Sequence, residues 1–461
     1  MAIEAAYMVP HPPMILPRIG KGAEGQIQKT VHSFEQIAEE IAGICPETLI
    51  ILSPHTVMYA DYFHISPGKS ARGDFGRFGA GEVRFEETLD EELVREIDKD
   101  ARRDAFPAGT LGERDRQLDH GVMVPLYFIR EKTRAGRIVR IGLSGLPLSA
   151  HYELGQRIRA AVEHLGRRAV VVASGDLSHK LQTYGPYGFA REGPEYDARL
   201  MDVCRRGAFG ELLEFDEAFC ERAAECGHRS FVIMAGALDG REVEARVLSH
   251  EDVTGVGYGV CAFRPGSVSG QRRFLETYRE AQKERIREIM AHEDPYVRLA
   301  RLTVESFVRE GRKPALPEWV TPQMRTEKAG VFVSIHARGR LRGCIGTIGS
   351  TRSCIAEEIR ENAVSAAMRD PRFDPVREDE LPFLEIHVDV LSRPERIGGR
   401  EELDVKRYGV IVSSGGKRGL LLPDLEGVDT VEEQIRIAMQ KGGIGAHERI
   451  TLERFEVVRH R

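Results

Sequence analysis

The hydrophobic pattern of the first 263 residues alternates between two periods. Short apolar runs rich in β-branched residues are followed by segments in which apolar residues recur every three or four positions, as on one face of a helix. The strand-like runs are 3–9, 49–52, 138–143, 169–173, 243–248 and 256–263. The helical segments are 26–42, 90–101, 150–165 and, in pieces, 194–238. This alternation predicts an α/β domain with a largely parallel or mixed sheet flanked by helices.

A different pattern begins after a stretch without apolar periodicity. Residues 264–273, RPGSVSGQRR, combine Pro, Gly, Ser and basic residues, which is typical of a linker. The segments beyond it read as helices at 274–290, 295–311, 353–368 and 431–440 and as strands at 331–335, 383–391, 408–412 and 419–422. We therefore expect a first domain over 1–263, a linker over 264–273 and a second, α+β domain over 274–461.

Length and composition agree with two soluble domains. The 461 residues exceed the roughly 250–300 residues that one core supports. The 66 basic residues nearly balance the 72 acidic ones, which argues against a dedicated nucleic-acid binder. Glu4 stands where a signal peptide needs a basic and then apolar segment, and no stretch approaches the ~20 apolar residues of a membrane span. Seven cysteines without a CxxC pair favour free thiols, so we expect a cytoplasmic protein that binds no membrane.

Three of the predicted strands run into short loops that hold a histidine. These are MVPHPP with His11, LSPHTV with His55, and SGDLSHK with Asp176 and His179. The crevice at the carboxyl ends of the strands is where open α/β sheets bind their ligands. Neutral imidazole is the commonest metal ligand in proteins, and two histidines with one carboxylate leave open positions on ferrous iron. The sequence therefore predicts a shared metal site, although a lone loop histidine is more often a solvated surface residue.

The third ligand has two candidates in the run Glu225-Cys226-Gly227-His228. A carboxylate from Glu225 would suit ferrous iron, whereas a thiolate from Cys226 would widen the choice to zinc or copper. Cys226 is also compatible with a small buried hydrophobic role. A glycine-rich segment, 66–82, follows His55 and reads as a lid over the site or as a surface loop.

The sharpest feature of the second domain is LRGCIGTI, residues 341–348. Arg342 could lower the pKa of the Cys344 thiol and make it a nucleophile. Successive residues of a strand point to opposite faces, so Arg342 and Cys344 share a face only if the strand is regular. We favour the alternative of a buried structural cysteine in a tight strand-to-turn site. His336 and His387 are the candidate partners of Cys344. The segment SSGGKRG, 413–419, lacks the spacing of a phosphate loop and fits a hairpin turn.

Five motifs of the first domain resemble, in order and spacing, a known superfamily. They are VPHPP, LSPH, DHGVMVPLYF, SGDLSH and ECGHRSFVIMAGAL, and the similarity covers residues 3–263. The superfamily is that of the class III extradiol dioxygenases, whose branches include the protocatechuate-type LigB catalytic subunit and the Memo proteins.

This resemblance implies roles for individual residues. His11 and His55 would be metal ligands, and His179 would be the acid–base histidine with Asp176 as its motif partner. His120, in LDHGV, would line the substrate side. The dioxygenases use a glutamate as third ligand, whereas the Memo branch has a cysteine followed by glycine. The pair Cys226-Gly227 therefore favours Cys226, with Glu225 as the alternative.

The second domain resembles the AMMECR family over about residues 275–461. The resemblance rests on LRGCIG, RDPRF (369–373), LEIHVDVLS (384–392) and YGVIVSSGGKRGLLLP (408–423). It implies a fold and a candidate surface around Arg342 and Cys344, without a reaction. In bacteria and archaea, AMMECR-type and Memo-type domains are associated with a radical SAM protein in the AmmeMemoRadiSam system, so a radical SAM partner is implied here.

Three hypotheses follow for function. The first is a metal-dependent, dioxygenase-like oxidoreductase that uses Fe(II), with Zn or Cu as alternatives, and acts on a small aromatic, catechol-like or otherwise chelating substrate. The second is a Memo-like metal-binding or redox protein that works with a radical SAM partner. The third is a non-enzymatic two-domain scaffold. A homo-oligomer is compatible with each of them.

Overall fold

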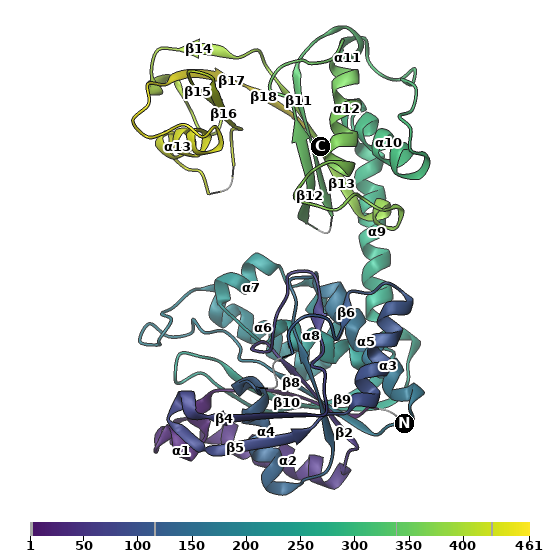
Figure 1. Cartoon of the computed structure of the whole chain (residues 1–461), viewed down its shortest axis with the longest axis vertical. Helices are drawn as coiled ribbons and strands as arrows, with labels where there is room; N and C mark the ends of the chain where they lie inside the picture. Colours follow the sequence, from purple (N-terminus) through teal and green to yellow (C-terminus); the bar gives the residue numbers. More distant parts are fainter. Residues whose placement is uncertain (1–2, 115–116, 338, 426) are drawn as a thin grey trace. The chain divides into compact units, whose positions relative to one another are not determined.

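The computed structural model describes residues 3–114, 117–337, 339–425 and 427–461. The chain forms two compact units, Met1–Tyr278 and Arg279–Arg461, and the division falls within helix α9 (Phe274–His292) (Figure 1). Residues 264–273, the expected linker, form the end of a strand, a 3-10 turn at Gly270–Arg272 and the residue before α9. No helix of the described residues is long and apolar enough to cross a membrane, and all seven cysteines are unpaired.

The first unit is built on a six-stranded sheet with the strand order β7-β2-β8-β1-β10-β9. Strands β7, β2, β8 and β1 are parallel, while β10 is antiparallel to β1 and β9 is antiparallel to β10. The bounds are β1 Ile3–Val9, β2 Thr48–Ser53, β7 Arg137–Gly142, β8 Ala169–Ser174, β9 Arg241–Glu251 and β10 Tyr258–Val268. The mixed sheet predicted from the alternating pattern is confirmed.

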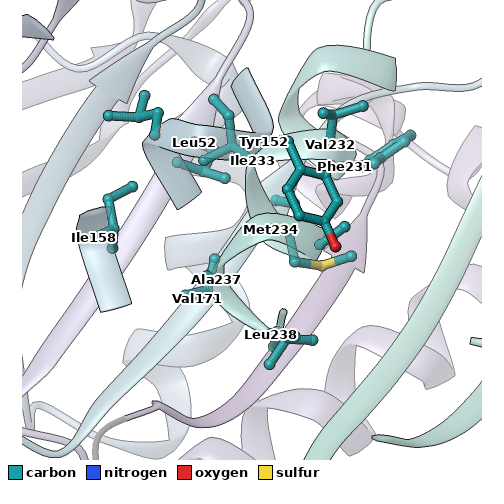
Figure 2. Close-up of a cluster of buried hydrophobic side chains, with 14 of the residues drawn as sticks. Leu52, Tyr152, Ile158, Val171, Phe231, Val232, Ile233, Met234, Ala237 and Leu238 are labelled. Carbon is teal, nitrogen blue, oxygen red and sulfur yellow. The ribbon is translucent and has the colours of Figure 1, made fainter. Parts of the chain in front are cut away.

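Helices cover both faces of this sheet. Alternate side chains of β1 enter two separate cores, one with α2 and α4 and the other with α3, α5, α6 and α8. Figure 2 shows part of the second core, where side chains of α5 and α8 pack with Leu52 and Val171. The helices are α1 Pro17–Gly20, α2 Gln28–Ile44, α3 Glu91–Arg103, α4 His120–Lys132, α5 Leu148–His164, α6 Glu192–Arg206, α7 Glu217–Ala223 and α8 His228–Ala237.

Two elements beside the sheet differ from the sequence-based expectation. The glycine-rich segment 66–82 contributes to a β-hairpin, formed by β4 (Ser70–Phe75) and β5 (Ala80–Thr88) around a 3-10 turn at Gly76–Phe78. Helix α4 was not predicted, because its residues are buried nearly all round and Pro125 interrupts them, so the segment lacks an amphipathic period. Two short strands, β3 (Phe63–His64) and β6 (Ala108–Gly109), pair in parallel.

A close backbone contact joins the loop after β8 to the loop before α8. A Cβ added at Gly175 would lie 2.1 Å from Cα of Gly227, and one added at Gly227 would lie 2.3 Å from Cζ of Phe231. The contact is secured by hydrogen bonds, because the backbone N–H groups of Cys226 and Gly227 donate to the carbonyl oxygen of Asp176 at 3.4 and 3.1 Å. Only glycine at both positions allows the two loops to approach this closely.

The second unit contains two antiparallel four-stranded sheets, in the orders β12-β11-β13-β18 and β14-β17-β15-β16. Helices α10 and α12 cover one face of the first sheet, and α13 packs on the second. The strands are β11 Gly330–Ala337, β12 Arg340–Gly346, β13 Leu384–Leu391, β14 Glu395–Ile397, β15 Gly409–Ser414, β16 Lys417–Leu421, β17 Thr451–Phe455 and β18 Val457–His460. The helices are α10 Pro295–Glu310, α11 Pro322–Thr326, α12 Ile355–Met368 and α13 Val431–Lys441. This is the expected α+β domain, and the β15–β16 hairpin contains the glycines of 413–419.

Two sequence motifs of the second unit hold each other in place. The buried carboxylate of Asp370 accepts the backbone N–H of Cys344 at 2.9 Å, and Arg372 donates to the Cys344 carbonyl oxygen at 3.1 Å. Arg372 also donates to the Asp370 carboxylate at 2.7 Å, and this hydrogen bond is the main cause that lowers the pKa of Asp370. The peptide of Cys344 is thus fixed on both sides by the 369–373 segment.

We predict that Gly227→Ala destabilises the first unit by about 1–3 kcal/mol, because the added methyl overpacks against Phe231 and Gly175. Urea unfolding measures the change. Gly43→Ala is the matched control, since a Cβ at Gly43 in α2 meets nothing within 4 Å. Equal stability of the two variants would contradict a tight contact at Gly227.

We predict that Asp370→Asn lowers the free energy of unfolding by about 1–2 kcal/mol, because it weakens the charged hydrogen bonds to Cys344 and Arg372. Asp379→Asn is the control, since Asp379 pairs with Arg377 on the exposed surface, where such pairs contribute less than about 1 kcal/mol. Thermal unfolding of both variants distinguishes the two sites. An unchanged midpoint for Asp370→Asn would contradict the role of Asp370 in holding the peptide of Cys344.

Candidate metal centre

Three loops of the first unit bring two histidines and a cysteine together beside the carboxyl ends of β1 and β2. His11 follows β1, His55 follows β2, and Cys226 precedes α8. Nε2 of His55 lies 3.0 Å from Nε2 of His11, and Sγ of Cys226 lies 3.7 Å from the same His11 atom. One ligand atom from each of the three residues lies within 4.8 Å of the other two. The structure therefore brings two imidazoles and one thiol to one point.

The two histidines are held by their neighbours. Nδ1 of His11 lies 3.0 Å from Oγ of Ser174, and its backbone N–H donates to Oδ1 of Asp176 at 2.9 Å. The backbone N–H of His55 donates to Oγ of Ser53 at 3.2 Å. In known metal sites, a hydrogen bond to the ring nitrogen that does not bind the metal fixes the orientation of the imidazole. Nε2 of His11 is thus left pointing toward His55 and Cys226.

The structure separates the two candidates for the third ligand. The Cys226 thiol lies beside the histidine pair and accepts a hydrogen bond from the backbone N–H of Asp176 at 3.3 Å. Oε2 of Glu225 instead accepts the backbone N–H of His228, the first residue of α8, at 2.6 Å. Loss of hydration raises the pKa of Glu225 to about 7. Adjacent side chains of this loop therefore point in different directions, and Cys226 is the one beside the imidazoles.

The spacing of the donor atoms fits one metal ion. Around a tetrahedral ion with metal–nitrogen bonds of about 2.0–2.1 Å and a metal–sulfur bond of about 2.3 Å, two nitrogens lie roughly 3.3 Å apart and a nitrogen and a sulfur roughly 3.6 Å apart. The observed separations are 3.0 and 3.7 Å. Imidazole and thiolate are ligands that suit zinc, copper and iron. The donor set therefore fits a divalent metal without identifying which one.

Two histidines of the cluster, His55 and His120, favour their neutral forms. His55 loses hydration where it packs into the cluster, and this, with the charges of His11 and His120, lowers its pKa to about 4. Loss of hydration and the charge of His11 lower the pKa of His120. Because a metal binds neutral imidazole, these shifts favour ligation at neutral pH.

His120 lies in the cluster without being one of the three converging ligands. Its ring stacks on His55 with centroids 4.1 Å apart, and the ring of Phe78 lies 5.4 Å away on the hairpin side. Asp119 caps helix α4 just before it and accepts hydrogen bonds from the hydroxyls of Ser53 and Thr56 at 2.6 and 2.7 Å. His120 thus borders the three candidate ligands, and it also lines the cleft beside them.

Asp176 and His179 flank the thiol on the other side. Nε2 of His179 lies 3.8 Å from Oδ2 of Asp176, and the His179 ring stacks on the exposed ring of Tyr187 with centroids 5.0 Å apart. Burial alone would raise the pKa of Asp176, but the charge of His11 and hydrogen bonds from His179 and His11 lower it. Asp176 is therefore held as a carboxylate between two histidines.

A cleft of about 960 Å³ opens beside the histidines. Its walls include His55, Asp119 and His120 on one side and the β4–β5 hairpin on the other. Ligand pockets in proteins commonly measure about 300–1,000 Å³, so the cleft is large enough for a substrate of several rings or a ring with a long substituent.

The residues singled out in the second unit have different surroundings. The guanidinium of Arg342 donates to the carboxylate of Glu380 at 2.8 and 3.0 Å, while the Cys344 thiol lies 3.2 Å from Oγ of Ser334. The rings of His336 and His387 lie 5.2 Å apart on the neighbouring strands β11 and β13. Arg342 thus binds a carboxylate of the 3-10 helix Glu378–Phe383, which precedes β13.

Sequence reasoning missed the residues that support the site. Ser53, Asp119 and Ser174 orient ligand loops through hydrogen bonds that join positions far apart in the chain. Only Asp119 carries a local signal, because aspartate is a preferred residue just before a helix and α4 begins at His120. Arg72 and Arg77 lie in the segment 66–82, which was interpreted as a lid or a surface loop, and Arg84 of β5 lies just beyond it.

Comparison with known proteins follows the same division of the chain. Residues 5–261 match the family model described as the catalytic LigB subunit of aromatic ring-opening dioxygenase, and residues 297–460 match the AMMECR1 model. A Clostridium acetobutylicum protein is 41% identical over 100% of both chains. A Thermotoga maritima protein is 49% identical over 37% of this chain and 100% of its own.

Two solved structures are also similar to parts of the chain. An uncharacterized protein from Pyrococcus horikoshii shares 32% identity, with a TM-score of 0.34 over 36% of this chain and 88% of that one. An uncharacterized protein from Escherichia coli K12 shares 14% identity, with a TM-score of 0.37 over 56% of this chain and 99% of that one. The family matches and the full-length relative confirm the resemblance seen in the motifs. The chain belongs to the family of the catalytic LigB subunit of aromatic ring-opening dioxygenases, and it carries an AMMECR1 domain after the LigB domain.

Proposed function

We propose that the first unit is a metal-dependent oxidoreductase that acts on a small chelating aromatic substrate. His11, His55 and Cys226 are its metal ligands, and Fe(II) is the metal. The convergence of these three donor atoms within 4.8 Å, in a domain of the LigB family, carries the proposal. Ferrous iron held by three protein ligands supplies open positions for a chelating diol and for dioxygen.

His179 takes a proton from a substrate hydroxyl at its ring nitrogen and later returns it. Histidine is the side chain that most often carries out such general acid–base transfer. The Asp176 carboxylate, 3.8 Å from Nε2 of His179, stabilises the protonated imidazole. His120 and Phe78 both line the cleft, and their aromatic rings favour a flat ring as the substrate.

The identity of the third ligand favours a second candidate function. A thiolate is a softer ligand than the carboxylate of the dioxygenases and also suits copper or zinc. Cys226 beside the histidines therefore supports a Memo-like metal-binding or redox protein that works with a radical SAM partner. The seven unpaired thiols support a reducing, cytoplasmic setting for either function.

We predict that Cys226→Ala lowers metal affinity at least tenfold, because it removes one of three ligands, while Glu225→Gln keeps the wild-type metal content. Anaerobic loading with Fe(II), followed by elemental analysis after gel filtration, measures metal per chain. Glu225→Gln is a matched control, since glutamine can still accept the backbone N–H of His228. The reverse result, metal lost with Glu225→Gln and kept with Cys226→Ala, would assign the ligand to Glu225.

We predict that His179→Gln leaves metal content unchanged and lowers substrate-dependent oxygen uptake by roughly 10²–10⁴-fold, the usual contribution of a general acid–base group. An oxygen electrode and a panel of catechols give the rates for iron-loaded protein. His164→Gln is the control, because His164 is an exposed histidine at the end of α5. Flat oxygen uptake by the wild-type protein across the panel would exclude the dioxygenase function and leave the Memo-like one.

A further inference from the structure

The cleft beside the histidines has a second end, formed by the β4–β5 hairpin. Arg72 on β4, Arg77 in the turn and Arg84 on β5 all line the same 960 Å³ cleft as His55 and His120. A molecule in this cleft therefore meets imidazoles at one end and guanidinium groups at the other.

The hairpin is held against the start of α4, so its arginines have a defined place. The backbone N–H of Leu118 donates to the carbonyl oxygen of Arg72 at 2.9 Å. A Cβ added at Gly73 would lie 2.7 Å from Sδ of Met123 and 2.9 Å from Cβ of Leu118. Glycine thus lets β4 pack directly on this segment, and the Phe78 ring reaches to within 5.4 Å of the His120 ring.

The three arginines are exposed, and among the described residues no carboxylate lies within ion-pair distance of them. Nε of Arg84 donates to the carbonyl oxygen of Gly81 at 2.8 Å. Elsewhere in the same unit, arginines with similar exposure, such as Arg206, hold two carboxylates at 2.8 Å. The hairpin guanidinium groups are therefore available to an anion that enters the cleft.

The other charges of the cleft are largely engaged within the protein. Asp119 accepts hydrogen bonds from two hydroxyls, and Oδ1 of Asp74 accepts the backbone N–H of Gly76 at 2.8 Å. Buried Arg140 donates to Ser66 at 2.7 Å and to the carbonyl oxygen of Gln117. In the hairpin register Glu86 lies opposite Arg72 and Asp74 lies opposite Arg84, so two of the three positive charges are offset. The hairpin end of the cleft therefore keeps a positive excess.

We propose that Arg72, Arg77 and Arg84 form a binding site for an oxyanion, a carboxylate or a phosphate monoester, on the tail of an aromatic substrate. Guanidinium groups match the planar geometry of such anions and bind them through paired, charged hydrogen bonds. That the aromatic end of the substrate lies beside the histidines rests on the proposed function. The anion site itself consists of arginines alone and binds in the absence of metal.

The test uses the full-length protein stripped of metal and three fluorinated aromatic probes that cannot chelate. They are 4-fluorophenyl phosphate, 3-(4-fluorophenyl)propionate and the neutral alcohol 3-(4-fluorophenyl)propanol. Titrations followed by ¹⁹F NMR give a Kd for each probe. The site variant is Arg72→Gln/Arg77→Gln/Arg84→Gln, and the control is Arg18→Gln/Arg95→Gln/Arg191→Gln, which removes the same charge from exposed positions outside the cleft.

We expect both anions, or one of them, to bind at least about tenfold more tightly than the alcohol, and the tighter anion identifies the group. The site variant loses this preference and the control variant keeps it. Equal binding of all three probes, or an equal loss in both variants, would overturn the anion site. Because no metal is present, this outcome is separate from the metal-loading experiments, whose failure would overturn the proposed function alone.

Discussion

The close approach of Gly175 to Gly227 is the contact on which the metal centre depends. These residues belong to loops that are 52 positions apart in sequence, after β8 and before α8, and a side chain on either would collide with the other loop or with Phe231. The hydrogen bonds beside the contact run both ways, from the backbone of Cys226 and Gly227 to Asp176 and from Asp176 back to the Cys226 thiol. The thiol, the carboxylate and His11 therefore share one rigid frame.

These loops hold the Cys226 thiol in a place where its ionisation is unfavourable unless a positive charge lies nearby. Loss of hydration, together with the negative charges of Asp176 and Glu225, raises the pKa of Cys226 well above its ordinary value. The imidazoles of His55 and His120 favour their neutral forms, so these two rings add no positive charge to stabilise a thiolate. A divalent cation supplies that charge and deprotonates a coordinating thiol. The electrostatics of the pocket thus agree with a metal centre better than with a reactive free cysteine.

Part of the fold and of the candidate site can be predicted from the sequence, because it depends on the local periodicity of apolar residues. The apolar runs of β1, β2 and β8 are distinct, and parallel strands bring His11, His55 and Asp176 to one edge of the sheet. Periodicity does not decide between Glu225 and Cys226, because their directions follow from the backbone angles of one short loop. It also does not reveal α4, which is buried nearly all round, or the hairpin of 70–88, whose arginines look like ordinary surface charges. In the second unit, the hydrogen bond from Cys344 to Asp370 joins two motifs that are far apart in the chain, and no local sequence pattern predicts that they pair.

X-ray absorption spectroscopy of the full-length protein, loaded with one equivalent of Zn²⁺, tests the metal centre most directly. The Cys226 centre predicts one sulfur neighbour at about 2.3 Å together with imidazole nitrogens at about 2.0–2.1 Å. A coordination shell of nitrogen and oxygen atoms alone, without sulfur, would contradict it.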